Sequence, residues 1–251
     1  MFWWWTFHVL VAGHIATGAT GLVSFWGPIV TKKGGKRHRS WGRVFTRCML
    51  ATGGLAVLIS ACTLIAPVET HPHIPDVALV RGIFGWMMQY LAILTVNLAW
   101  YGWMCIENRR DHARNRDWRN VALQWLVLAT SLNTAAQGWL IGQPLMIGMA
   151  VVGVATFATN MRFIYMANPD PSAWLREHIK GLVGAGISVY TAFFAFGAVR
   201  IMPEAALHPG LWAVPLVTGI SLILYHWRAV HIQYKARLRP APPRTPDATA
   251  A

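Results

Sequence analysis

Seven apolar stretches of roughly 20 residues each constrain this chain more than any other feature. A stretch of that length crosses the hydrocarbon core of a bilayer as an α-helix. Charged residues make up only 12% of the chain, about half the share found in soluble domains. The sequence therefore predicts an all-α, polytopic transmembrane helix bundle. The seven predicted spans cover residues 7–30, 45–66, 79–106, 121–141, 145–164, 179–202 and 211–231.

Basic residues fall almost entirely on one side of these spans. Of the 22 Lys and Arg residues, 20 lie in or beside the first, third and fifth connections and the C-terminal end, and only Arg81 and Arg200 lie on the other side. Cytoplasmic loops carry the excess of basic residues in membrane proteins. We therefore expect the N-terminus outside, the C-terminus in the cytoplasm, and insertion in the cell inner (plasma) membrane. The first span has no basic leader and is too long for a signal peptide, which predicts that it is retained.

Domain organisation and charge follow the same pattern. Residues 1–239 form one predicted transmembrane domain, and residues 240–251, rich in Pro, Ala and Thr, are predicted to be a disordered cytoplasmic tail. The net charge of +13 sits in short loops between apolar runs, so we expect contact with the bilayer and its anionic lipids, and no nucleic acid partner. The three cysteines lie in or beside apolar runs, which predicts no disulfide and no zinc site.

The predicted spans also lack the groups that several membrane protein classes need. They contain no Asp or Glu, which counts against a proton- or sodium-coupled transporter. The seventh span has no Lys, which excludes a retinal Schiff base there. No P-loop, dinucleotide-binding fingerprint or nucleophile–base arrangement is present, so the sequence assigns neither an enzymatic reaction nor a metal ion.

Three histidines near the ends of predicted spans share a helix face with small residues. Such residues allow either close helix packing, with the histidines hydrogen-bonded or handling protons, or room for a flat cofactor that the histidines ligate. Haem b needs two axial ligands at similar depth, which His178 and His226 provide, whereas His14 lies near the other side. The candidate cofactor is therefore haem b. The candidate cofactor-binding residues are His14, His178 and His226.

The connection after the first span, residues 31–45, is strongly basic. Gly34 and Gly35 let the chain reverse, and residues 42–43 are predicted to open the second helix. Basic residues here meet the anionic cytoplasmic leaflet, each worth about 1 kcal/mol near the surface. The candidates for binding a lipid headgroup phosphate or another anion are His38, Arg39 and Arg43.

Two motifs stand out in the chain. Residues 33–45 match K-G-G-x-x-H-R-x-x-G-R-x-F, and Trp174 begins W-x-x-x-H, followed by T-A-F at residues 191–193. Together they resemble a family of bacterial multi-pass membrane proteins of unknown function, over roughly residues 8–50 and 172–200. The resemblance implies a multi-pass membrane architecture, and it implies no particular activity because the family's function is unknown. It directs attention to His14, His38, Arg39, Gly42, Arg43 and His178.

Side-chain amides lie inside the predicted spans as well. Two interpretations of these amides stay open. They form interhelical hydrogen bonds, each worth about 0.6–2 kcal/mol, or they line a substrate pathway. The candidate haem b site suggests a redox protein. These amides, together with the basic connection, motivate an alternative: a non-enzymatic membrane protein that binds or transports a lipid or small molecule. These amides are Asn97, Asn133, Gln137 and Asn160.

His178 carries the most specific structural expectation. It enters the sixth predicted span beside Gly181 and Ala185, which leave space for a partner. We predict that its side chain points into the bundle and meets either the seventh span near His226 or the cytoplasmic end of the first span.

Overall fold

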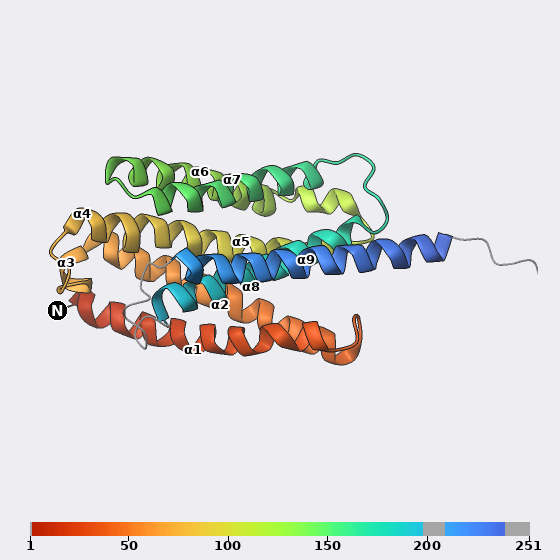
Figure 1. Ribbon diagram of the computed structural model, residues 1–251, viewed down its shortest axis with the longest axis horizontal. Coiled ribbons are helices and arrows are strands. Elements are labelled where there is room, and N and C mark those ends of the chain that lie inside the picture. Colours follow the sequence, from red (N-terminus) through yellow and green to blue (C-terminus); the bar gives the residue numbers. More distant parts are fainter. Residues whose placement is uncertain (1, 198–208, 239–251) are drawn as a thin grey trace, which may run out of the picture.

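The computed structural model describes residues 2–197 and 209–238, and these residues form helices joined by short turns, with no strand among them. The predicted all-α class is thereby confirmed for the described residues. The long helices run alongside one another as a bundle (Figure 1). They are α1 (Phe2–Val30), α2 (Lys36–Ile65), α5 (Met88–Glu107), α6 (Trp118–Leu140), α7 (Pro144–Ile164), α8 (Ala173–Ala192) and α9 (Pro209–Leu238).

Five helical segments are long and apolar enough to cross a membrane. The two other long helices, α6 and α8, do not reach that apolarity along their length and pack within the same bundle (Figure 1). Large apolar side chains such as Val23, Trp139 and Val217 lie exposed on the bundle surface, as lipid contact requires. These features indicate a multi-pass membrane protein. The five segments are Phe2–Val30, Lys36–Ile65, Val77–Glu107, Pro144–Ile164 and Ala213–Lys235.

The start of α2 differs from the prediction. The helix begins at Lys36, so the basic residues form its first turns and Gly42 lies inside it. The prediction that residues 42–43 open this helix is therefore wrong. The physical reason is that Gly34, at φ 73°, completes the reversal without further glycines.

The third predicted span is a composite element. Short α4 (Val77–Leu79) leads into the π-helix η1 (Val80–Met87), which continues directly into α5. Asp76 caps the start, because its side chain accepts a hydrogen bond from the backbone N–H of Leu79 at 2.9 Å. The remaining short elements are α3 (Pro67–Thr70), η2 (His112–Arg116) and η3 (Phe193–Gly197).

Helix α8 lies against α1, α5 and α9, and its contact with α5 is the tightest. A Cβ at Gly181 would lie 2.6 Å from the Gly102 Cα, so the two backbones touch at this crossing. Small residues commonly permit such approach between membrane helices. The crossing therefore fixes where the polar side chains of α8 meet those of α5.

Two predicted regions fall outside the described residues. They are the last residues of the sixth span, up to residue 202, and the disordered tail at residues 240–251.

Candidate functional site

Amide side chains from three helices meet inside the bundle. Asn97 on α5, Gln124 on α6 and Asn160 on α7 are each 0% exposed. The Asn160 Nδ2 donates to Gln124 Oε1 at 3.0 Å and more weakly to Asn97 Oδ1 at 3.4 Å. Because one amide bridges two others, the three helices are tied together by side chains and not only by packing.

This cluster continues toward the segment that joins α5 to α6. Gln124 Nε2 approaches Asn120 Oδ1 at 3.5 Å, and Asn120 Nδ2 donates to the Asn115 carbonyl at 2.7 Å. Asn115 Oδ1 in turn accepts from Asn108 Nδ2 at 3.0 Å. We call the set Asn97, Asn108, Asn115, Asn120, Gln124 and Asn160 the amide chain. All six side chains are buried, so the amide chain is a polar line from the α5–α6 connection into the bundle interior.

Two atoms at the inner end of the amide chain have no hydrogen-bond partner among the described residues: Asn97 Nδ2, a donor, and Asn160 Oδ1, an acceptor. A third such atom is the indole Nε1 of Trp100, one turn further along α5. Leaving a buried donor or acceptor unpaired costs about 1–3 kcal/mol. A small molecule carrying both an acceptor and a donor would satisfy this end of the chain.

A partly buried ion pair lies between α5, α7 and α8. The Tyr101 hydroxyl donates to Glu177 Oε2 at 2.6 Å, and the Lys180 ammonium pairs with the same oxygen. Lys180 also donates to Thr159 Oγ1 at 3.3 Å. The expectation that no carboxylate lies inside the sixth span followed from a predicted start at residue 179. Helix α8 begins earlier, at Ala173, so Glu177 lies within the helix and against α5.

His178 is buried at the α5–α8 crossing. Its Nδ1 lies 2.9 Å from the Gly102 carbonyl oxygen, and because a carbonyl only accepts, Nδ1 carries the proton. No hydrogen bond to its Nε2 is made by any residue that the structure describes. The side chain does point into the bundle, but its partner is on α5 and not on the first or seventh predicted span. The reason is the Gly102–Gly181 contact, which makes α5 the nearest backbone.

His38 and His226 lie at the same end of the bundle as His178. His38 interacts electrostatically with both other histidines, and its Nδ1 lies 3.1 Å from the Pro28 carbonyl oxygen. Lys33 interacts with His226 and donates to the Pro28 carbonyl at 2.8 Å. Partial burial lowers the pKa of Lys33. Three basic groups from separate segments therefore gather where α1 ends.

The remaining predicted residues lie elsewhere. His14 places its Nδ1 3.0 Å from the Thr52 carbonyl oxygen on α2, away from His178 and His226. Arg39 and Arg43 are exposed, one turn apart on α2. Asn133 and Gln137 on α6 are partly buried and are not part of the amide chain. The structure thus brings together Asn97 with Asn160, and His38 with His178 and His226.

Several residues of these clusters escaped the sequence analysis. Asn120 lies just before the predicted start of the fourth span and was treated as a loop residue, although it stands four residues from Gln124 on one helix face. Glu177 and Lys180 carry a similar signal, since opposite charges at i and i+3 pair along a helix. Tyr101, four residues after Asn97, had no signal beyond its position on the same face.

Comparison of the chain with protein-family models, with curated proteins and with solved structures found no match. In the part of the chain that the structure describes, no group of three or more His, Cys, Asp or Glu side chains is arranged to hold a metal ion. The function must therefore be argued from the site itself.

Proposed function

We propose that the chain is a seven-span protein of the cell inner membrane, with the N-terminus outside, that binds a small neutral polar molecule at the inner end of the amide chain. The observation that carries the proposal is the pair of buried, unpartnered atoms, Asn97 Nδ2 and Asn160 Oδ1. Placement of 20 of 22 basic residues on one side supports the orientation, and the packing of α6 and α8 beside the five apolar segments supports seven spans.

The chemistry of the amide chain favours a neutral ligand. Amides do not titrate in the physiological range, and the six side chains offer donors and acceptors without net charge. A hard cation needs about six oxygen ligands, whereas the buried side chains that the structure describes offer one unpartnered amide oxygen. A ligand with one hydrogen-bond acceptor for Asn97 and one donor for Asn160 fits this pattern.

The route to the site favours the cytoplasm. The amide chain ends at Asn108 and Asn115, in the α5–α6 connection, which carries four arginines. Under the positive-inside rule this connection is cytoplasmic. A polar ligand would therefore exchange its hydration for amide hydrogen bonds from the cytoplasmic side.

Mass spectrometry of small molecules that co-purify with the protein in lipid nanodiscs tests this proposal. We expect at least one polar molecule to be enriched with the wild type and lost from Asn160→Leu. The matched control is Asn133→Leu, which replaces an amide outside the amide chain and should retain the molecule. An identical set of molecules from both variants, each shown to be folded by its melting temperature, would refute the proposal.

A second candidate function, a redox protein that binds haem b, is favoured by one specific observation. The Nδ1 atoms of His178 and His38 are both held by backbone carbonyls, which leaves Nε2 as the atom with the lone pair. Metal-ligating histidines usually show this arrangement. Because Nδ1 of His178 faces α5, its Nε2 points away from α5. An imidazole Nε2 with a free lone pair is a ligand that haem iron takes, and His178 with His226, the pair predicted from the sequence, would hold a haem, which supplies one-electron chemistry when bound.

An absorption spectrum separates the two candidates. If haem is bound, purified protein supplemented with haemin shows a Soret band that shifts on reduction, and His178→Ala or His226→Ala abolishes it. His8→Ala, which alters an exposed histidine on α1, serves as the control and should leave the band intact. A preparation that takes up no haem would remove this candidate and leave the first one standing.

A further inference from the structure

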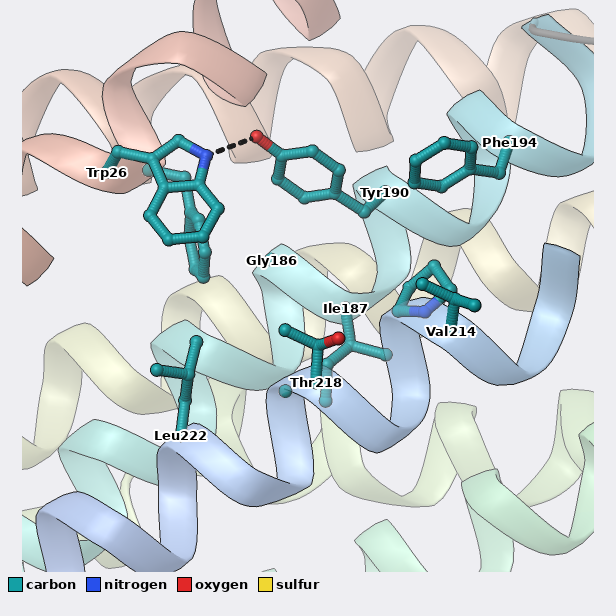
Figure 2. A pocket seen from close by; sticks show the side chains of 11 residues that line it. Trp26, Gly186, Ile187, Tyr190, Phe194, Val214, Thr218 and Leu222 are labelled. Atoms are coloured by element: carbon teal, nitrogen blue, oxygen red, sulfur yellow. Dashed lines mark hydrogen bonds between the residues drawn. The ribbon is translucent and has the colours of Figure 1, made fainter. Parts of the chain in front are cut away.

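An apolar groove lies between α1, α8 and α9, far from the amide chain. Its volume is about 180 Å³, and it opens on the surface of the bundle. Figure 2 shows Trp26 from α1, Gly186 and Tyr190 from α8, and Thr218 and Leu222 from α9 around it. Its walls are almost entirely apolar, so hydrocarbon is the chemistry it suits.

Two glycines create the groove. A Cβ at Gly186 would lie 2.2 Å from the Phe25 ring, and a Cβ at Gly219 would lie 2.1 Å from Ile187 Cγ1. Each neighbour therefore rests directly on a helix backbone, and a depression remains between α1 and α9. This floor is fixed by close packing and does not depend on a flexible loop.

The indole N–H and the phenol in the groove wall already have hydrogen-bond partners within the protein. Trp26 Nε1 donates to the Tyr190 hydroxyl at 2.7 Å, as Figure 2 shows, and that hydroxyl donates to the Leu22 carbonyl at 2.9 Å. Because the indole N–H and the phenol are paired with each other, they need no hydrogen bond from an occupant. The groove thus differs from the amide chain, whose inner end has unpartnered polar atoms.

One end of the groove is basic. Leu222 lies four residues before His226, so both share a face of α9, and His226 interacts electrostatically with Lys33 and His38. Among the described residues, no carboxylate forms an ion pair with any of these three groups. The groove therefore joins an apolar wall to an uncompensated basic end at the predicted cytoplasmic surface.

From this pairing we propose that the groove binds one acyl chain of an anionic phospholipid, whose phosphate lies at Lys33, His38 and His226. The positive charge of Lys33 selects an anionic headgroup, and the opening of the groove on the bundle surface lets the chain enter from the surrounding bilayer. Of the three residues predicted from the sequence to bind an anion, His38 lies at this end and interacts electrostatically with Arg39, and both Arg39 and Arg43 are exposed on α2.

Native mass spectrometry of protein reconstituted with equal amounts of phosphatidylglycerol and phosphatidylcholine tests this site. We expect the wild type to retain phosphatidylglycerol preferentially and Thr218→Trp, which fills the groove, to lose the retained lipid. The matched control is Val217→Trp, one residue away on the exposed face of α9, which should behave as wild type. Lys33→Gln should lower the phosphatidylglycerol preference roughly five-fold, the effect of one cation near an anionic surface.

Three outcomes would overturn the inference, given variants with wild-type melting temperatures. Equal lipid retention by Thr218→Trp and Val217→Trp would show that the groove holds no lipid. An unchanged lipid preference in Lys33→Gln and in His226→Gln would show that no headgroup binds at the basic end. A dimer mass in the wild type that Thr218→Trp abolishes would make a second copy of the chain the occupant.

Discussion

Two parts of the bundle are held together by different means. The α1–α2 hairpin contains no Asn or Gln, and its helices approach through glycines, as where Gly21 faces Met49. The α5–α7 group contains seven Asn and Gln residues, and three of them bond to one another across helices. Since lipid is as apolar as leucine, burial alone does not select helix partners in a membrane. The hairpin solves this mainly by shape, with two hydrogen bonds at Thr52 from His14 and to Thr17, and the α5–α7 group solves it by hydrogen bonds between buried amides.

This difference distinguishes polar side chains that only hold helices together from polar side chains that also offer a binding site. A packing contact is complete once the surfaces touch, whereas a hydrogen-bonded set is complete only when every buried donor and acceptor is paired. The hairpin meets its condition. The amide chain does not, and that incompleteness is the reason to locate a ligand there and not in the hairpin.

Substitution where α5 crosses α8 should have the largest effect. In Gly102→Leu the new Cβ would lie 2.9 Å from the Leu182 backbone nitrogen, which cannot move aside. We expect a loss of about 3 kcal/mol in the free energy of unfolding, the upper end for overpacking. Gly54→Leu, whose Cβ would meet nothing within 4 Å, is the control. Equal melting temperatures for the two variants in detergent would contradict the close backbone contact between α5 and α8.

Breaking the amide chain should cost somewhat less. Asn160→Leu removes the donor shared by Gln124 and Asn97 and leaves both buried amides without it. The expected destabilisation is about 2 kcal/mol, because an unsatisfied buried polar group costs about 1–3 kcal/mol. Asn133→Leu should change stability by less than about 0.5 kcal/mol. Unfolding in a graded denaturant series measures both, and a larger effect from Asn133→Leu would reverse the assignment.

The glycine contact between α8 and the hairpin should tolerate a small added side chain better. Gly186→Ala pushes the Phe25 ring, which has room to rotate only at some cost in packing. Overpacking costs about 1–3 kcal/mol, and the gain in helix propensity over glycine returns about 1 kcal/mol. A net loss near 1 kcal/mol, smaller than that of Asn160→Leu, is therefore expected from the same denaturant series. The reverse order would show that the glycine contacts, and not the amides, dominate stability.

The smallest effect concerns the connection between α7 and α8. Hydrogen bonds from Ser172, and then the charge of Arg176, lower the pKa of the exposed Asp170 carboxyl. A lowered folded-state pKa contributes stability above the ordinary value of about 3.9 and loses it as the pH falls through the lowered value. Asp170→Asn should therefore melt below wild type at pH 7, and the difference should shrink progressively as the pH falls below about 3.9. A gap in melting temperature that stays constant as the pH is lowered would exclude the carboxylate as its cause.

Hydropathy located the described helices to within a few residues at most ends, because length and apolarity alone mark them. It misplaced the starts of α2 and α8, where Lys36 and Glu177 were treated as loop residues although a helix tolerates charge near its end. Hydropathy could not predict which helices contact one another. Periodicity assigned Asn97 and Asn160 to interiors, but nothing local indicates that they meet each other or that His178 meets Gly102. Such partners depend on glycine contacts between helices distant in sequence.

The Gly102–Gly181 crossing also has a mechanical meaning. With two backbones in contact and His178 bonded to the Gly102 carbonyl, the N-terminal half of α8 is fixed against α5. A hydrogen bond between Thr95 and Ser188 joins the same two helices two turns further along. Tyr190 lies roughly 14 Å along the helix from Gly181, at 1.5 Å per residue. The contacts with α5 therefore position both the ion pair of Glu177 and Lys180 and the groove wall at Tyr190, so a change at the crossing would displace both.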